Sequence, residues 1–405
     1  GAASNLGQGN NIGLGGGTLS FIGGASQSTN RPLNVTASST LSANGTGGAT
    51  ITYTGAVSAA GNSLTLIGSG DGYVNGSITQ TGTAADINVN SGAWHLGGSA
   101  NVIADDIIVT GTSTGTAVLN LDVTGGISYT AGTSNGLYAR DGGVINLNAN
   151  DVNGAGNSGG LDFIILGDTP TGAAGTLNTN GFNITTPRLD LGAIISGRTG
   201  MITGSGTITG TYTGTDYLSG FRFFDGTITA NLAGDTTILK QGLDSVTLSG
   251  DNSGLTGVVA ANTRIDSGTL ILDYTTSNTS KLNTVRAVEL RGATIQILGN
   301  NGAATSQNFA GLTLGNGGSS EIEVIAGTGQ NAVLNLGTIT RANNAQDGTM
   351  RFVLPSGTQS GVNGITTTSP NSTSGLLGNG TTSTNDAAYA TVTDATGTWF
   401  ATASI

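Results

Sequence analysis

The stretch from Thr236 to Leu272 reads TTILKQGLDSVTLSGDNSGLTGVVAANTRIDSGTLIL and contains the pattern that decides the fold. Its apolar residues recur mostly at every second position, which is the spacing of a strand with one buried face. Glycines, which permit sharp changes of direction, separate the apolar runs. Because short strands of this kind are not stable alone, we expect the unit to repeat and the copies to stack on one another.

A five-residue motif of the form apolar-x-apolar-x-Gly supports such a repeat. In a strand its two apolar residues point to the same side, and the glycine lets the chain turn a corner. Copies occur at 19–23, 64–68, 94–98, 246–250 and 295–299. Further strands are expected at 107–109, 117–123, 144–147, 163–166, 322–325, 333–336 and 351–354. The sequence therefore indicates an internal repeat of irregular length.

The composition indicates an all-β chain with almost no helix. Of 405 residues, 71 are glycine and 5 are proline, only three are glutamate and two are lysine, and no window has apolar residues at helical spacing. Disordered chains combine few apolar residues with high net charge, whereas this chain is 36% hydrophobic and 9% charged. A packed β structure is therefore the better interpretation.

Charge and cysteine content narrow the possible partners and chemistry. The net charge of -11 and the scattered arginines argue against nucleic acid, because phosphate binding needs clustered Lys and Arg. No apolar run reaches the roughly 20 residues of a membrane-spanning helix, and no signal-peptide pattern opens the sequence. The absence of cysteine removes disulfides, thiolate metal sites and cysteine nucleophiles.

We expect a continuous parallel β-solenoid over residues 1–355. Strand signals run along the chain without a linker, whereas sandwich domains of about 100 residues would show boundaries. At roughly 20 to 25 residues per turn, the chain would make about 16 to 20 turns. Residues 356–387, rich in Ser, Thr, Asn and Gly, are expected to form a loop or irregular cap, and residues 388–405 to form terminal strands that close or extend the solenoid.

Nine Asn-Gly pairs leave an antiparallel alternative open. Asn-Gly is a common two-residue hairpin turn, and the pairs include Asn44-Gly45, Asn180-Gly181 and Asn363-Gly364. A β-sandwich or an array of hairpins is therefore the alternative to the solenoid.

Part of the opening stretch resembles the autotransporter-associated β-strand repeat. That repeat typically reads Leu-x-Lys-x-Gly, then Thr-Leu-x-Leu-Ser-Gly-x-Asn, then a Gly-Thr-Leu run, to which 239–242, 246–252 and 267–272 are similar. Two segments depart from it: Leu243-Asp244-Ser245 replaces a Gly-containing turn, and Leu255-Thr256-Gly257 replaces Tyr-Thr-Gly. The resemblance implies a right-handed parallel β-helix, secreted or displayed on a bacterial surface, and specifies architecture rather than chemistry.

His95 is the only histidine of the chain. A catalytic triad or a histidine-based metal site would therefore have at most one histidine member. Because His95 lies between Trp94 and Leu96, it should point away from the core, and we expect an ordinary exposed side chain.

Two pairs of carboxylates are the candidates for glycoside cleavage, which uses two such groups about 5 to 10 Å apart. Asp105 and Asp106 are adjacent and would point to opposite sides of a strand. Glu321 and Glu323 share one strand face, which favours a solvated face or a weak cation site. We therefore expect no catalytic residue and no enzymatic activity, with a polysaccharide-active β-helix as the second alternative.

Calcium is the one cofactor that the sequence leaves open, because Asp-Gly turns supply carboxylate and carbonyl oxygens. The candidate ligands are Asp71, Asp141, Glu321 and Glu323. The nonapeptide calcium repeat is absent, so aspartates bonded to nearby backbone are the expected arrangement, and no bound cofactor is predicted.

The expected function is structural. Apolar ladders inside, little charge outside and unprotected solenoid ends are typical of a subunit that associates with copies of itself in a bacterial surface fibre or extracellular matrix. The first alternative is a monomeric adhesin or autotransporter passenger stalk that contacts cell surfaces or polysaccharide. A groove lined by Asp, Arg and aromatic side chains would favour glycan binding.

Overall fold

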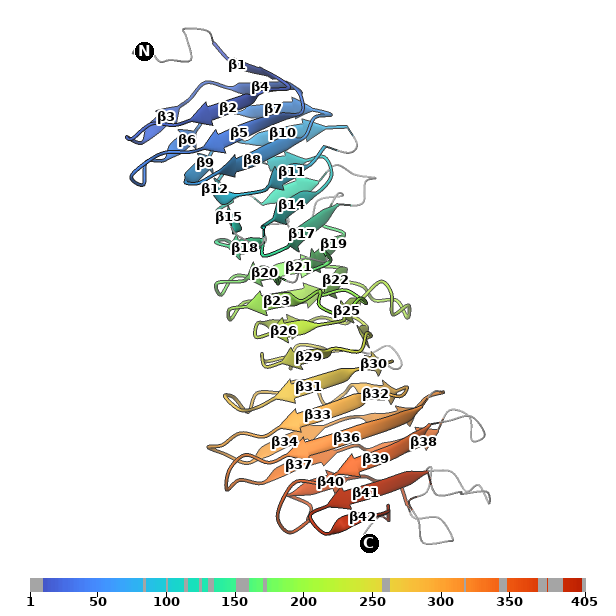
Figure 1. The fold of residues 1–405 in the computed structure, drawn as a ribbon. Helices are drawn as coiled ribbons and strands as arrows, with labels where there is room; N and C mark the ends of the chain where they lie inside the picture. Colours follow the sequence, from blue (N-terminus) through green and yellow to red (C-terminus); the bar gives the residue numbers. More distant parts are fainter. Residues whose placement is uncertain are drawn as a thin grey trace. The chain divides into compact units, whose positions relative to one another are not determined.

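The computed structural model describes residues 10–82, 85–99, 101–112, 116–123, 126–129, 135–150, 160–169, 173–256, 263–316, 318–341, 348–370, 377 and 389–402. Every regular element among them is a β-strand, and none of them lies in a helix. The strands stack in about 12 turns that form a β-solenoid (Figure 1). Successive turns pair in parallel, which confirms the solenoid and excludes the sandwich and the hairpin array.

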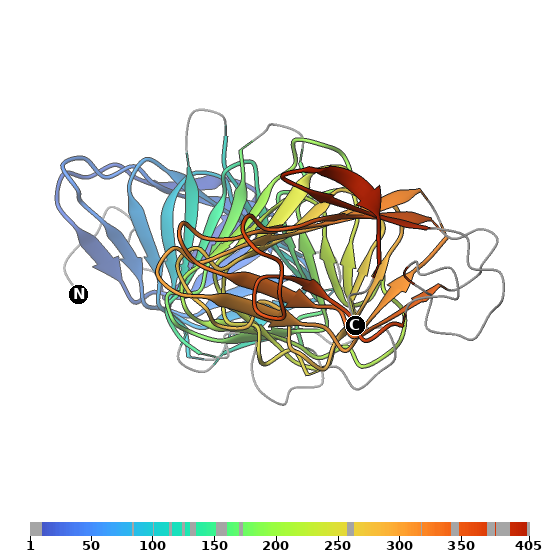
Figure 2. The same cartoon turned by 90° about the horizontal axis from the view of Figure 1, so that it is seen from below.

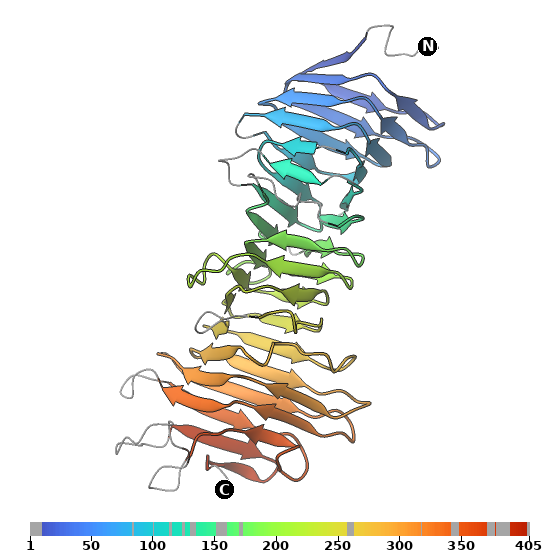
Figure 3. The same cartoon turned by 180° about the vertical axis from the view of Figure 1, so that it is seen from behind.

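The chain divides into two compact units. Unit 1 comprises Gly1–Gly192 and Gly197–Ile208, and unit 2 comprises Ala193–Ser196 and Thr209–Ile405. Each unit is built from three stacks of strands, called A, B and C in unit 1 and D, E and F in unit 2. Figure 3 shows from behind how the strands of each unit lie one above another. Three more short strands are β21 (Ile184–Thr186), β24 (Thr207–Gly210) and β27 (Asn231–Ala233).

Each turn of unit 1 contributes strands to the stacks in a fixed order. Stack A contains β1 (Ile12–Gly15), β4 (Leu33–Ala37), β7 (Val57–Ala60), β10 (Ile78–Thr81), β13 (Asn101–Ile103) and β16 (Ile127–Tyr129). Stack B contains β2 (Thr18–Phe21), β5 (Ser39–Ala43), β8 (Leu64–Gly68), β11 (Ile87–Val89), β14 (Ile107–Thr110), β17 (Gly136–Arg140), β19 (Phe163–Leu166) and β22 (Arg188–Leu191). Stack C contains β3 (Gln27–Thr29), β6 (Ile51–Tyr53), β9 (Asp71–Val74), β12 (Gly92–Leu96), β15 (Ala117–Leu121), β18 (Val144–Leu147), β20 (Gly175–Asn178) and β23 (Gly200–Thr203).

The turns of unit 2 also contribute strands to three stacks. Stack D contains β25 (Phe221–Phe223), β28 (Ile238–Lys240), β30 (Thr263–Ile265), β32 (Ala287–Leu290), β35 (Gly311–Leu314) and β38 (Thr338–Arg341). Stack E contains β26 (Gly226–Ile228), β29 (Ser245–Leu248), β31 (Thr269–Asp273), β33 (Thr294–Leu298), β36 (Ser319–Ile325), β39 (Thr349–Val353), β41 (Ala390–Asp394) and β42 (Gly397–Phe400). Stack F contains β34 (Thr305–Asn308), β37 (Ala332–Asn335) and β40 (Gly364–Thr366).

The core consists of columns of apolar side chains that run from turn to turn. In stack C, side chains at the same register position form one such column, and all of them are fully buried: Trp94, Leu119, Ile145, Leu177 and Ile202. All six apolar residues of the opening stretch that keep the period-two spacing are also fully buried: Val246, Leu248, Leu255, Ile265, Leu270 and Leu272. The alternation in the sequence thus places every second side chain in the core.

The number of turns, about 12, is lower than the expected 16 to 20. Paired residues on some successive turns are further apart in sequence than the roughly 20 to 25 positions assumed. Ile107 pairs with Leu137, and Leu312 pairs with Ile339. Segments between the strands lengthen the turns, and strand periodicity alone does not show their length.

The Asn-Gly pair at Asn180 and Gly181 forms a corner of the solenoid instead of an antiparallel hairpin. Both residues have positive φ, 50° and 86°, as a tight turn of this type requires. The strands before and after it, β20 and β21, belong to different sheets. A turn signal of this kind therefore gives the position of a bend but not the direction in which the next strand pairs.

The sequence predicts a loop or irregular cap over residues 356–387. The structure places β40 in this segment, where it pairs in parallel with β37, while 371–376 and 378–387 lie outside the described residues. Within the predicted terminal strands, β41 continues stack E in parallel and β42 folds back on it antiparallel. Residues 388 and 403–405 lie outside the described part of the chain.

Candidate functional site

The aspartates proposed for calcium do not gather. Asp71 is exposed at the start of β9, and Asp141 lies in the turn after β17, where its Oδ1 accepts a hydrogen bond of 2.6 Å from the Thr169 hydroxyl. Among the described residues, no group of three or more His, Asp or Glu side chains could hold a metal ion. Asp141 lies in a turn, as the sequence predicts, but this hydrogen bond comes from a side chain of the next turn of the solenoid and not from nearby backbone.

The glutamates proposed for calcium, Glu321 and Glu323, both lie on the outer face of β36, and each has a partner on a neighbouring strand. Arg351 Nη1 lies 3.0 Å from Glu321 Oε2, and Gln296 Nε2 donates a hydrogen bond of 2.6 Å to Glu323 Oε2. These are cross-strand pairs between stacked turns, which stabilise a sheet modestly. They form the solvated face expected from the sequence.

His95 differs from the expected exposed histidine. It points outward as predicted, but its side chain is only 21% exposed. Its ring stacks on Tyr73 of the previous turn, with centroids 4.2 Å apart. Nδ1 lies 2.6 Å from Asp122 Oδ2, and Nε2 lies 3.2 Å from Asn120 Nδ2. Parallel register brings these residues together although they are distant in sequence.

The contacts of His95 extend into two rows of side-chain amides on the outer face of stack C. Asn146 Nδ2 donates to Asn120 Oδ1 over 2.9 Å, which continues the row that begins at His95. In the second row, Asn148 Nδ2 donates to Asp122 Oδ1 over 2.6 Å, and Asn180 Nδ2 donates to Asn148 Oδ1 over 3.1 Å. The network links polar groups of consecutive turns, and this makes it part of the scaffold.

Asp105 and Asp106 lie in the bend between β13 and β14 and not within a strand, where they would point to opposite sides. Asp106 Oδ1 accepts a hydrogen bond of 2.8 Å from the Gly136 N–H. Burial, together with repulsion from Asp105 and Asp86, raises the pKa of Asp106 to about 6, although the Gly136 hydrogen bond and Arg140 act in the opposite direction. A raised carboxyl pKa occurs at functional sites, but buried structural carboxylates show it as well.

Asp106→Asn is expected to stabilise the protein at pH 7 and to have little effect at pH 4. The pKa is higher in the folded state than in an unfolded chain, about 6 against 3.8, so the stability of the wild type falls as pH rises through this window. Asparagine keeps Oδ1 as the acceptor for Gly136 without carrying charge, which should add about 1 kcal/mol at pH 7. Melting temperatures at the two pH values measure this, with the exposed Asp71→Asn as control. Equal shifts at both pH values would show that Asp106 carries no buried-charge penalty.

Arginine, aspartate and aromatic side chains do gather on the outer face of stack B. The Arg140 guanidinium lies 4.2 Å from the Tyr138 ring centroid and binds Asp168 through two hydrogen bonds of 2.9 and 3.0 Å. Tyr138 packs edge-on against Phe163 at 5.5 Å. These residue types were named above as a sign of glycan binding. Here the Arg140 guanidinium is engaged by Asp168.

The last described turn of unit 2 exposes large apolar side chains. Trp399 and Phe400 of β42 are 60% and 65% exposed (Figure 2, where β42 is red and in front). Trp399 pairs with Val392, which continues the inner column of Ile322 and Phe352. Trp399 would therefore be core in an inner turn but is open to solvent here, whereas Phe400 pairs with Thr391 on the outer face.

The first described turn of unit 1 has a similar open edge. Each of β1, β2 and β3 is hydrogen-bonded to a strand on one side only among the described residues. Leu19 and Phe21 of β2 are half-buried, whereas Leu41 in the same register on β5 is fully buried. Ile22, which follows β2, is 76% exposed.

No protein-family model, no curated protein and no solved structure matches the chain. The resemblance to the autotransporter-associated repeat therefore remains a prediction. None of the residues that the structure describes forms a helix capable of crossing a membrane.

Proposed function

We propose that the protein is a structural β-solenoid that associates with copies of itself into extracellular fibres on a bacterial surface. The observation that carries this proposal is the edge at β42, the last strand of stack E among the described residues, where Trp399 and Phe400 are 60% and 65% exposed. An unpaired edge strand is a template for another strand, and exposed aromatic side chains add apolar area that association would bury.

The partner in this proposal is a second copy of the chain, bound through the edge formed by β1, β2 and β3. Among the described residues, each strand of that edge is also hydrogen-bonded to a strand on one side only, and its apolar residues Leu19, Phe21 and Ile22 are incompletely covered. Contact between two different edges of identical chains is heterologous, and such contacts produce open filaments when the rotation does not close a ring. Secretion and surface display are proposed with it, on the strength of the repeat resemblance.

Replacing Trp399 and Phe400 together with aspartate is expected to abolish self-association. Two carboxylates at the edge would repel each other, and both would have to lose their hydration in any contact between chains. Sedimentation velocity between about 1 and 100 µM, a range that spans typical subunit affinities, should show large species for the wild type and a single small species for the variant.

The matched control is Leu243→Asp. Leu243 is 86% exposed in a turn of unit 2, so this variant also introduces a carboxylate at an exposed apolar position, but away from β42. It should sediment like the wild type. Self-association that survives in the Trp399 and Phe400 double variant, or is lost equally in the control, would refute the role of this edge.

A further inference from the structure

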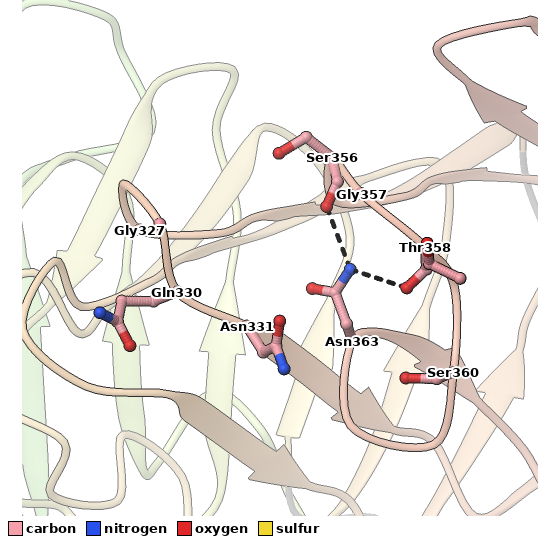
Figure 4. A pocket seen from close by; sticks show the side chains of 9 residues that line it. Gly327, Gln330, Asn331, Ser356, Gly357, Thr358, Ser360 and Asn363 are labelled. Atoms are coloured by element: carbon pink, nitrogen blue, oxygen red, sulfur yellow. Dashed lines mark hydrogen bonds between the residues drawn. The ribbon is translucent and has the colours of Figure 1, made fainter.

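A hollow of about 530 Å³ lies in unit 2 between the turn at 327–331 and the loop at 356–363. Three glycines and six polar residues line it, and none of the nine is charged or apolar: Gly327, Gly329, Gln330, Asn331, Ser356, Gly357, Thr358, Ser360 and Asn363. Figure 4 shows Gln330 and Asn331 on one wall and the loop that carries Ser356, Thr358 and Ser360 on the other. The volume is within the usual range for small-molecule sites, about 300 to 1,000 Å³.

Buried Asn363 holds the loop wall in place. Its Nδ2 donates to the carbonyls of Ser356 and Thr358, at 3.0 and 3.2 Å (dashed in Figure 4). Its Oδ1 accepts a hydrogen bond of 3.1 Å from the Ala332 N–H, which ties the loop to β37. Three hydrogen bonds of one buried side chain therefore fix the wall, and this lowers the entropic cost of binding.

Four side chains of the hollow have hydrogen-bonding groups that no described residue uses. They are the carboxamides of Gln330 and Asn331 and the hydroxyls of Ser356 and Thr358. Elsewhere in the chain, carboxamides are often committed to backbone or to the next turn, as at Asn300 and Asn101. Each of the four groups can both donate and accept.

We propose that this hollow binds a neutral sugar residue. An ionic ligand would need an opposite charge in the lining, and an apolar ligand would need an apolar wall, and the lining offers neither. Sugar hydroxyls also donate and accept, so they match uncommitted carboxamides and hydroxyls. The hollow does not involve β42, so the proposal is independent of self-association.

Saturation-transfer NMR on the full chain tests the proposal with the methyl glycosides of glucose, galactose and mannose, with N-acetylglucosamine, and with galacturonate as an anionic comparison. At least one neutral probe should bind with a dissociation constant in the millimolar range, and galacturonate should not. Asn331→Ala and Gln330→Ala should each weaken that binding about five- to tenfold, the loss of one or two hydrogen bonds.

The control variant is Asn34→Ala, which removes an exposed carboxamide from β4 in unit 1. It should leave binding unchanged, and so should the Trp399 and Phe400 double variant, even if that variant no longer associates. Circular dichroism checks that each variant is folded. The proposal fails if no neutral probe binds, if galacturonate alone binds, or if Asn331→Ala binds as tightly as Asn34→Ala.

Discussion

Trp94→Ala is expected to lower the free energy of unfolding by about 3 to 5 kcal/mol, the usual cost of removing a buried tryptophan. Trp94 is fully buried, and its Nε1 donates a hydrogen bond of 3.3 Å to the Ile67 carbonyl. Its ring occupies the space above Gly72 on the preceding turn, where a Cβ would come within 2.4 Å of the ring. Because Gly72 has no side chain to fill the gap, the cavity left by alanine should persist.

Urea unfolding followed by circular dichroism measures this effect. The control is Trp399→Ala at low protein concentration, since Trp399 is the only other tryptophan and is 60% exposed. It should change the free energy of unfolding by less than about 0.5 kcal/mol. A small loss for Trp94→Ala would mean that neighbouring turns collapse into the cavity, contrary to the rigid stacking described above.

Lys240→Met is expected to lower the free energy of unfolding by about 2 kcal/mol at pH 7. The buried Nζ donates to the carbonyls of Gln241, Gly242 and Ser267, at 2.8, 3.0 and 3.2 Å. Methionine fills similar space but donates nothing, so the carbonyls of Gln241 and Ser267, on successive turns, lose this donor, whereas the Gly242 carbonyl keeps the Ser267 hydroxyl. Arg351→Met, at a 48% exposed side chain paired with Glu321, should cost much less.

The pH dependence of the loss caused by Lys240→Met distinguishes the contribution of the lysine charge from that of its packing. Burial lowers the pKa of Lys240 to about 8, against 10.5 in an unfolded chain, although Asp244 and Asp225 act in the opposite direction. Between these values the unfolded state binds more protons, so this group makes stability rise with pH. The loss caused by Lys240→Met should therefore be larger at pH 9.5 than at pH 7. An equal loss at both would show that Nζ stays fully charged throughout.

Strand positions were predictable because they depend on local alternation. The runs 144–147 and 163–166 coincide with β18 and β19, since each alternates in burial with two side chains in the core. The parallel stacking followed from the repeat itself. The number of turns could not be predicted in this way, because it depends on the length of segments that carry no periodic signal.

The features of the surface depend on register and were largely missed. Asp122 and Tyr73 meet His95 only because their strands stack on β12, which no pattern within one strand reveals. The rarity of lysine could have pointed to Lys240 and Lys281, because a rare charged residue in a low-charge chain is a candidate for a special role. Both lysines are fully buried. The hollow lies partly in 356–363, where turn-rich sequence predicts a loop but not its shape.

Electron microscopy of the purified chain at several concentrations tests the central claim, self-association through the β42 edge, most directly. The account predicts unbranched filaments that become more numerous as concentration rises and are absent from the Trp399 and Phe400 double aspartate variant. Separate particles of a single chain at every concentration would contradict it.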